Sequence, residues 1–147
     1  MDTVLEQKYV QLLTEKKLEH NHRKHIIGVF ITYTCEQLGI SKPYPKIVLN
    51  NDPAFGLKNK TFGHFNVIEN KIVVAGTNRN LADVLRTIAH ELTHYYQKES
   101  GAINGQNINQ SGETGSDIEN EANAKAGVIM RGFGKMHPEI YAYSVYT

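Results

Sequence analysis

Residues 80–100 read NLADVLRTIAHELTHYYQKES, and this stretch decides the fold. Its large apolar residues recur at steps of three and four: Leu81, Val84, Leu85, Ile88, Leu92 and Tyr95. That spacing predicts one amphipathic helix with its apolar face buried. Asn78 or Asn80 can cap the start of the helix, Asp83 in the first turn favours the helix dipole, and Gly101 ends it.

The same helix carries the pattern HExxH at residues 90–94. His90 and His94 are four residues apart, so their Cβ atoms are about 5–6 Å apart on one face. Both imidazoles can then reach one zinc ion at roughly 2.0–2.1 Å. Glu91 follows His90 by about 100° of helical rotation, so it flanks the ion and can act as a general base. The motif predicts zinc-dependent peptide hydrolysis with one Zn²⁺ per chain, and we expect Thr87, His90, Glu91 and His94 to share an open side.

The segment after this helix changes character. Residues 101–116 are rich in Gly, Asn and Ser, which predicts a loop, and their position between two helices favours a role as a lid. Residues 117–131 return to a helical pattern, with Ser116 as the cap and residues 132–134, Gly-Phe-Gly, as the stop. A catalytic zinc site usually has a third protein ligand, and we expect it from this second helix.

Three carboxylates in the second helix compete for that role. Glu119 is the favoured ligand because it shares a helical face with small and flexible residues that allow a close approach to the first helix, namely Ala122, Asn123, Ala126 and Met130. Glu121 points about 200° away from that face, towards solvent, and Asp117 is the third alternative. Acidic residues in a first helical turn also interact favourably with the helix dipole, so the sequence leaves the choice among the three open.

The arrangement HELTHYYQ, a polar loop and then ENEANAKAG resembles the gluzincin branch of the zincin metallopeptidases. It is similar to small ImmA/IrrE-type and SprT-like peptidases, and the likeness covers roughly residues 46–131. In the ImmA/IrrE type the third ligand opens an E-x-x-A stretch, which Glu119 and Ala122 match. Thermolysin-like relatives have an aspartate four residues after the ligand, where this chain has Asn123. Orientation of the imidazoles would then come from Asp83, Asn123 or a backbone carbonyl.

The resemblance implies an α+β, zincin-like fold, with a small mixed β-sheet packed on the active-site helix. Residues 46–50 predict a strand, and residues 61–68 and 71–75 predict a hairpin. We expect residues 61–68 to form the edge strand that receives an extended substrate, with Gly63 and His64 as substrate-binding residues because glycine permits a close backbone approach.

The rest of the chain is expected to belong to the same single domain, residues 1–147, with the zincin core at 46–131. N-terminal helices within residues 1–40 are predicted over 3–18 and 25–38, joined by a polar segment at 20–24. Residues 132–147 form a C-terminal tail. Peptidases of this kind often add an oxyanion donor opposite the metal, for which Tyr141 and Tyr143 are candidates, with Tyr146, His137 and His64 as alternatives.

Composition narrows the class of protein. Sixteen basic and fifteen acidic residues give a net charge of +1, which predicts no general attraction to nucleic acid or to anionic membranes. The single cysteine, Cys35, excludes an intramolecular disulfide and is expected to be a buried, unreactive thiol. The first residues do not read as a secretory signal and no apolar run reaches the ~20 residues of a membrane span, so we expect a cytoplasmic protein.

Two other functions fit the same motif. The chain could be a zinc-binding regulatory or protein-interaction module without turnover, although such a module has no need of a general base at Glu91. It could also be a DNA-associated SprT-like peptidase, although the near-neutral charge and the lack of a zinc-ribbon cysteine set weigh against that. In the leading hypothesis the partner is a protein or peptide substrate, and the sequence sets no oligomeric state.

Overall fold

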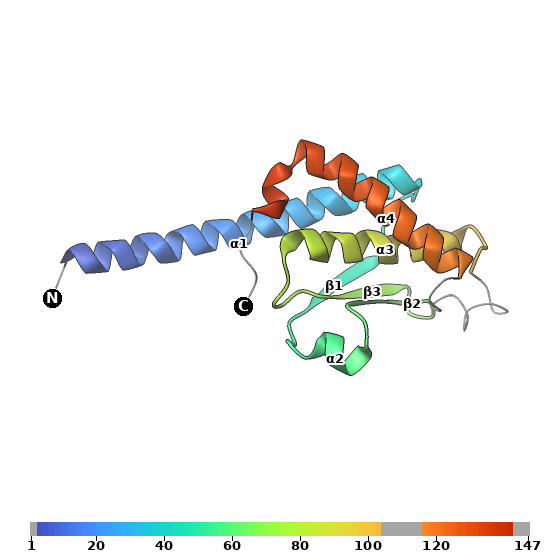
Figure 1. The fold of residues 1–147 in the computed structure, drawn as a ribbon, viewed down its shortest axis with the longest axis horizontal. Coiled ribbons are helices and arrows are strands. Elements are labelled where there is room, and N and C mark those ends of the chain that lie inside the picture. The colour runs from blue at the N-terminus through green and yellow to red at the C-terminus, as the bar shows by residue number, and fades with distance from the viewer. Residues whose placement is uncertain (1–2, 104–115, 143–147) are drawn as a thin grey trace.

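The computed structural model describes residues 3–103 and 116–142, apart from the side chains of Tyr9 and of residues 12–18. This part of the chain is α+β, as predicted, with a small mixed sheet of three strands. Figure 1 shows the arrangement of the elements. In chain order they are α1 (Thr3–Leu38), β1 (Lys46–Asn50), α2 (Phe55–Asn59), β2 (Gly63–Asn66), β3 (Lys71–Ala75), α3 (Leu81–Glu99), α4 (Asp117–Met136) and the 3₁₀ helix η1 (Pro138–Tyr141).

The N-terminal region is one helix, so the prediction of two helices with a polar joint at residues 20–24 is wrong. Helix α1 runs unbroken for 36 residues, and its first half extends beyond the rest of the molecule (Figure 1). The predicted joint contains polar residues but no Gly or Pro, and polarity alone does not interrupt the helical hydrogen bonds. Arg23 lies within the predicted joint, is only 2% exposed, and pairs with Glu19 one turn earlier at 3.0 Å.

The sheet has the strand order β1-β3-β2. Strand β1 is parallel to β3, and β2 pairs antiparallel with β3, which confirms the predicted hairpin. The first hairpin strand is shorter than predicted, Gly63–Asn66 within residues 61–68. Because β3 is central, β2 lies at an edge of the sheet, as expected for that strand.

Helix α3 lies between the sheet and the two other long helices (Figure 1). It contacts β2 and β3 on one side, and α1 and α4 on the other. The predicted apolar stripe is buried throughout, with exposures between 0% and 7%: Leu81, Val84, Leu85, Ile88, Leu92 and Tyr95. A helix covered on both sides also buries polar groups, and this places the residues of the HExxH motif inside the molecule.

Helix α4 starts where the sequence predicts and ends later. The Oγ atom of Ser116 accepts a hydrogen bond from the backbone N–H of Glu119 at 3.1 Å, which confirms the predicted cap. The glycines at 132 and 134 do not stop the helix, which continues to Met136. A Cβ atom at Gly132 would overlap the hydroxyl group of Tyr33, and one at Gly134 would lie 2.7 Å from that of Tyr141. These glycines therefore allow the two tyrosine side chains to pack closely against α4.

Cys35 lies in the core between the helices and is fully buried, as predicted. Burial, assisted by the negative charge of Glu36, raises the pKa of its thiol to about 11. The thiol is therefore protonated at neutral pH, which makes it a poor nucleophile. Within residues 3–103 and 116–142, no helix combines the length and the apolar character needed to cross a membrane.

Candidate metal centre

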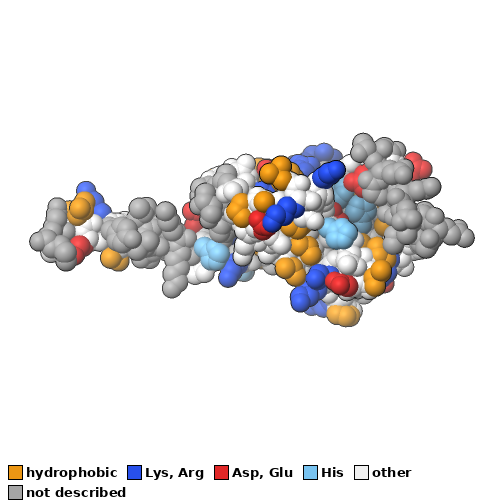
Figure 2. Space-filling model, turned by 90° about the horizontal axis from the view of Figure 1, so that it is seen from below, with side chains coloured by type: hydrophobic (Ala, Val, Ile, Leu, Met, Phe, Trp, Pro, Cys, Tyr) orange, Lys and Arg blue, Asp and Glu red, His pale blue; other side chains and the backbone are white. Residues whose placement is uncertain are grey.

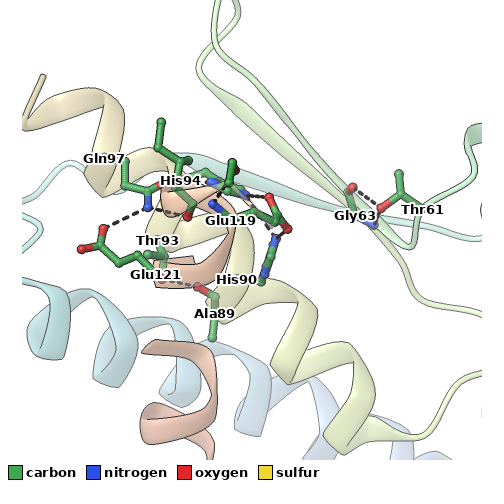
Figure 3. Close-up of polar contacts among 11 residues, drawn as sticks. Thr61, Gly63, Ala89, His90, Thr93, His94, Gln97, Glu119 and Glu121 are labelled. Atoms are coloured by element: carbon green, nitrogen blue, oxygen red, sulfur yellow. Dashed lines mark hydrogen bonds and ion pairs between the residues drawn. The ribbon is translucent and has the colours of Figure 1, made fainter. Parts of the chain in front are cut away.

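Three side chains from two helices converge at one point. His90 and His94 project from α3, and Glu119 projects from the first turn of α4 and lies between them (Figure 3). The Nε2 atom of His90 is 2.7 Å from Oε1 of Glu119, and the Nε2 atom of His94 is 3.2 Å from Oε2 of the same carboxylate. The two Nε2 atoms are 3.1 Å apart. The structure thus brings the favoured third residue to both histidines.

These spacings fit a small divalent cation. Ligand atoms at 2.0–2.1 Å from a tetrahedral zinc ion are about 3.3 Å from one another. The three donor atoms lie within 4.8 Å of one another, and their closest approaches of 2.7–3.2 Å need only a slight separation to admit the ion. Two imidazole nitrogens and one carboxylate oxygen form a donor set typical of catalytic zinc, and within the described residues it is the one such cluster.

A buried glutamine fixes the second histidine. The Nδ1 atom of His94 is 2.8 Å from Oε1 of Gln97, which is 1% exposed. The Nε2 amide group of Gln97 donates to the carbonyl oxygen of Ile118 and to Oε1 of Glu121, both at 2.9 Å. Both partners can only accept, so Oε1 of Gln97 must accept from Nδ1–H of His94. This tautomer leaves the lone pair of Nε2 directed at the cluster.

Substitution Gln97→Leu is expected to weaken zinc affinity about 10–100-fold, the usual effect of losing a hydrogen bond to a ligand histidine. It removes the acceptor for His94 and the link between α3 and the residue before Glu119. The measurement is a competition titration with a chromophoric chelator. The matched control is Gln37→Leu, at an exposed position of α1, which should keep wild-type affinity. Equal affinities in the two variants would show that Gln97 does not orient the site.

His90 also has a partner outside the cluster of His90, His94 and Glu119. Burial and the neighbouring His94 lower the pKa of His90, while Glu119 and a side-chain hydrogen bond with Asn123 act in the opposite direction. A lowered pKa favours the neutral imidazole that a metal requires. Asn123 was one of three groups expected to orient an imidazole. Asp83 lies exposed instead, with its carbonyl oxygen accepting from Thr87 and Arg79, and the second orienting group is Gln97.

Glu91 lies next to this cluster in a more enclosed place than predicted. Glu91 is 6% exposed and His94 9%, so the prediction of an open side for both is wrong. Strand β2 covers this part of α3: a Cβ atom at Gly63 would overlap Thr87 and would lie 3.1 Å from Cγ of Glu91. Burial, with a smaller contribution from the negative charge of Glu119, raises the pKa of Glu91 to about 8. A bound cation would lower this pKa and favour the carboxylate.

Gly63 and His64 lie on opposite faces of the edge strand β2. Glu91 and Thr87 fill the space that a side chain at Gly63 would occupy, on the face of β2 that packs against α3. His64 is exposed and alternates along β2 with the buried Gly63 and Phe65, so it lies on the other face of the strand. Gly63 thus permits β2 to pack on α3, and His64 does not face Glu91; the binding of a substrate along this strand stays a prediction.

Two of the candidates for an oxyanion donor, Tyr141 and His137, lie far from the cluster. Tyr141 packs with its hydroxyl group against Gly134, fifteen residues after Glu119 on the same helix and hence about 22 Å along its axis. That expectation is therefore wrong for Tyr141. His137 is at the same far end, stacked on Phe133. Tyr143 and Tyr146, and residues 104–115 of the expected lid, lie outside the described residues.

The two other carboxylates of the second helix have separate surroundings. Asp117 is exposed at the start of α4, near the positive end of the helix dipole. Glu121 is exposed and accepts from Gln97, so it supports the cluster through an intermediate residue (Figure 3). Figure 2 shows histidine side chains at the surface of the globular part of the molecule.

Comparisons of the chain with models of protein families, with curated proteins and with solved structures found no match. The assignment of a function to this site therefore depends on its own chemistry. That chemistry consists of a three-donor cluster, a buried carboxylate beside it and a network that orients one imidazole.

Proposed function

We propose that this chain is a zinc-dependent peptidase of the zincin type. In this proposal His90, His94 and Glu119 hold the metal ion and Glu91 is the general base. The observation that carries the proposal is the convergence of these four side chains, with three metal-binding atoms within 4.8 Å of one another and the buried carboxylate on the adjacent helical position. A purely structural zinc site has four protein ligands, whereas this cluster supplies three within the described residues, as catalytic sites do.

The chemistry follows from the donor set and from Glu91. When bound, a zinc ion would polarise the scissile carbonyl group and increase the acidity of water in the site. An Oε atom of Glu91 takes the proton from the attacking water and passes it to the nitrogen of the leaving amine. Enclosure of Glu91 beneath β2 excludes bulk water from this carboxylate and holds its side chain against Gly63. His94, oriented by Gln97, keeps its Nε2 lone pair available for the ion.

The sheet supports a peptide as substrate. Strand β2 pairs with β3 on one side only, and its residue Gly63 contacts Glu91. An extended peptide added along the other side of β2 would form main-chain hydrogen bonds and pass close to the general base. This geometry suits a polypeptide better than a compact small molecule. No feature of residues 3–103 and 116–142 specifically favours a module without turnover or a DNA-associated peptidase.

Removal of metal is the direct test of this function. Purified protein loaded with zinc is expected to cleave casein, to lose cleavage after treatment with 1,10-phenanthroline, and to recover it when zinc is restored. Elemental analysis should find about one zinc per chain. Cleavage that survives a complete loss of metal, or a protein that binds no zinc after reconstitution, would contradict the proposal. Zinc binding without cleavage would favour the module without turnover.

A further inference from the structure

Arg79 lies between β3 and α3 and is connected with the proposed site through Thr87. Its Nη1 group donates to the carbonyl oxygen of Ala75 at 3.0 Å. Its Nη2 group donates to the carbonyl oxygen of Asp83 at 3.1 Å and to Oγ1 of Thr87 at 2.8 Å. These contacts hold the guanidinium group in a fixed orientation beside the first turns of α3.

All these acceptors are uncharged, so none of the three hydrogen bonds neutralises the positive charge of Arg79. Within residues 3–103 and 116–142, no carboxylate lies within ion-pair distance of its guanidinium group. The side chain is partly buried, and desolvation lowers the pKa of the guanidinium group although Asp83 acts in the opposite direction. A cation held partly out of water without an ion pair is unfavourable, and a bound anion would relieve this cost.

One face of the guanidinium group is covered, and two of its N–H groups have no partner among the described residues. The guanidinium carbon of Arg79 lies 4.4 Å from the centroid of the Phe62 ring. Phe62 is in turn held against Gly56 of α2, where a Cβ atom would lie 2.7 Å from the ring. A guanidinium group has five N–H donors, and the three hydrogen bonds described use three of them. The remaining donors, on Nε and Nη1, lie on different edges of the group, so each is free to donate a single hydrogen bond to one carboxylate oxygen.

A chain of contacts connects Arg79 with the general base. Thr87, which accepts from Arg79, packs against Gly63 and precedes Glu91 by one helical turn, about 6 Å along α3. An extended peptide advances about 3.3 Å per residue. A carboxylate on Arg79 would therefore belong to a substrate residue about two or three positions from the bond that is cleaved.

From this geometry we infer that Arg79, supported by Phe62, is a binding residue for a carboxylate group of the peptide substrate. The inference rests on the proposed peptidase function and specifies its substrates. The carboxylate comes from an aspartate or glutamate side chain or from a free C-terminus, because both present a negatively charged oxygen that can accept a charge-assisted hydrogen bond. Peptides with an acidic group near the scissile bond are accordingly preferred.

The test uses zinc-loaded protein with Glu91→Gln, immobilised so that peptides bind without being cleaved. The probe is a random pool of twelve-residue peptides, amidated at the C-terminus in one arm and free in the other, and retained peptides are sequenced by mass spectrometry. We expect about tenfold enrichment of peptides with a carboxylate, the usual effect of a charge-assisted hydrogen bond. Enrichment of Asp and Glu in the amidated arm identifies side chains as the source, whereas enrichment confined to the other arm identifies the C-terminus.

Arg79→Gln in the same background should abolish this enrichment. Arg79→Lys should retain only part of it, because an ammonium group keeps the charge but cannot make the three hydrogen bonds that fix the guanidinium group. The control is Arg131→Gln, an exposed arginine twelve residues beyond Glu119 on α4, which should leave the enrichment unchanged. The comparison of acidic and neutral peptides without any change at Arg79 stays informative even where Arg79→Gln impairs folding.

The outcomes separate this inference from the proposed function. Unchanged acid enrichment in a folded Arg79→Gln protein, or no enrichment with Arg79 present, would overturn the inference. Casein cleavage by the wild-type chain would then still support the peptidase. Conversely, enrichment that depends on Arg79, in a protein whose wild type cleaves nothing, would retain the carboxylate site and overturn the peptidase. Failure of both assays overturns both.

Discussion

Substitution Glu91→Gln is expected to reduce peptide hydrolysis by about 10²–10⁴-fold, the usual contribution of a general base, and to leave the zinc content unchanged. Glutamine has nearly the shape of glutamate, so it fits the enclosed space beneath Gly63 where Glu91 is 6% exposed. Its amide cannot accept the proton of the attacking water. Because burial raises the pKa of Glu91 to about 8, the neutral replacement should not destabilise the metal-free protein.

The measurement combines initial rates of casein cleavage with elemental analysis of the same samples. Glu99→Gln provides a matched control, because Glu99 is an exposed residue near the end of the same helix. The control should keep both wild-type rate and wild-type metal content. A Glu91→Gln protein that cleaves at the wild-type rate would exclude Glu91 as the base, whereas loss of metal would assign it a role in holding the ion.

Substitution Glu119→Ala should lower zinc affinity by more than about 100-fold, which exceeds the usual effect of losing a group that only orients a ligand. The carboxylate of Glu119 lies between the two Nε2 atoms at 2.7 and 3.2 Å, so its loss removes one of three donors. Glu121→Ala is the natural comparison on the same helical turn. Gln97 would still donate to the carbonyl oxygen of Ile118, so affinity should fall no more than about tenfold.

Competition titrations provide the affinities, and thermal unfolding provides an independent measurement. Zinc should raise the melting temperature of the wild type and of Glu121→Ala in a concentration-dependent way, because a ligand of the folded state stabilises it. The same zinc concentrations should stabilise Glu119→Ala far less. Equal affinities in the two alanine variants would exclude Glu119 as the third ligand.

Much of the local structure follows from short-range patterns. The strands at residues 46–50 and 71–75 have the predicted bounds, since runs of β-branched residues between turns specify strands. Helix α3 follows from its apolar period. Two predictions about helix ends, the joint in α1 and the stop in α4, were wrong because polar residues and glycines were expected to interrupt a helix. A polar segment did not interrupt α1, and the glycines of α4 serve packing against Tyr33 and Tyr141.

The sequence by itself determined that His90 and His94 face the same way with Glu91 beside them, because spacing along one helix fixes direction. It left Glu119, Glu121 and Asp117 as alternatives for the third ligand. It also did not indicate Gln97 as a partner of His94, although Gln97 follows His94 by three residues and so lies on the same helical face. Tertiary structure decided these points, as it decided the burial of Glu91 beneath Gly63. Each depends on how α4 and β2 pack on α3, and contacts between segments distant along the chain are set by the fit of whole surfaces, which no local periodicity encodes.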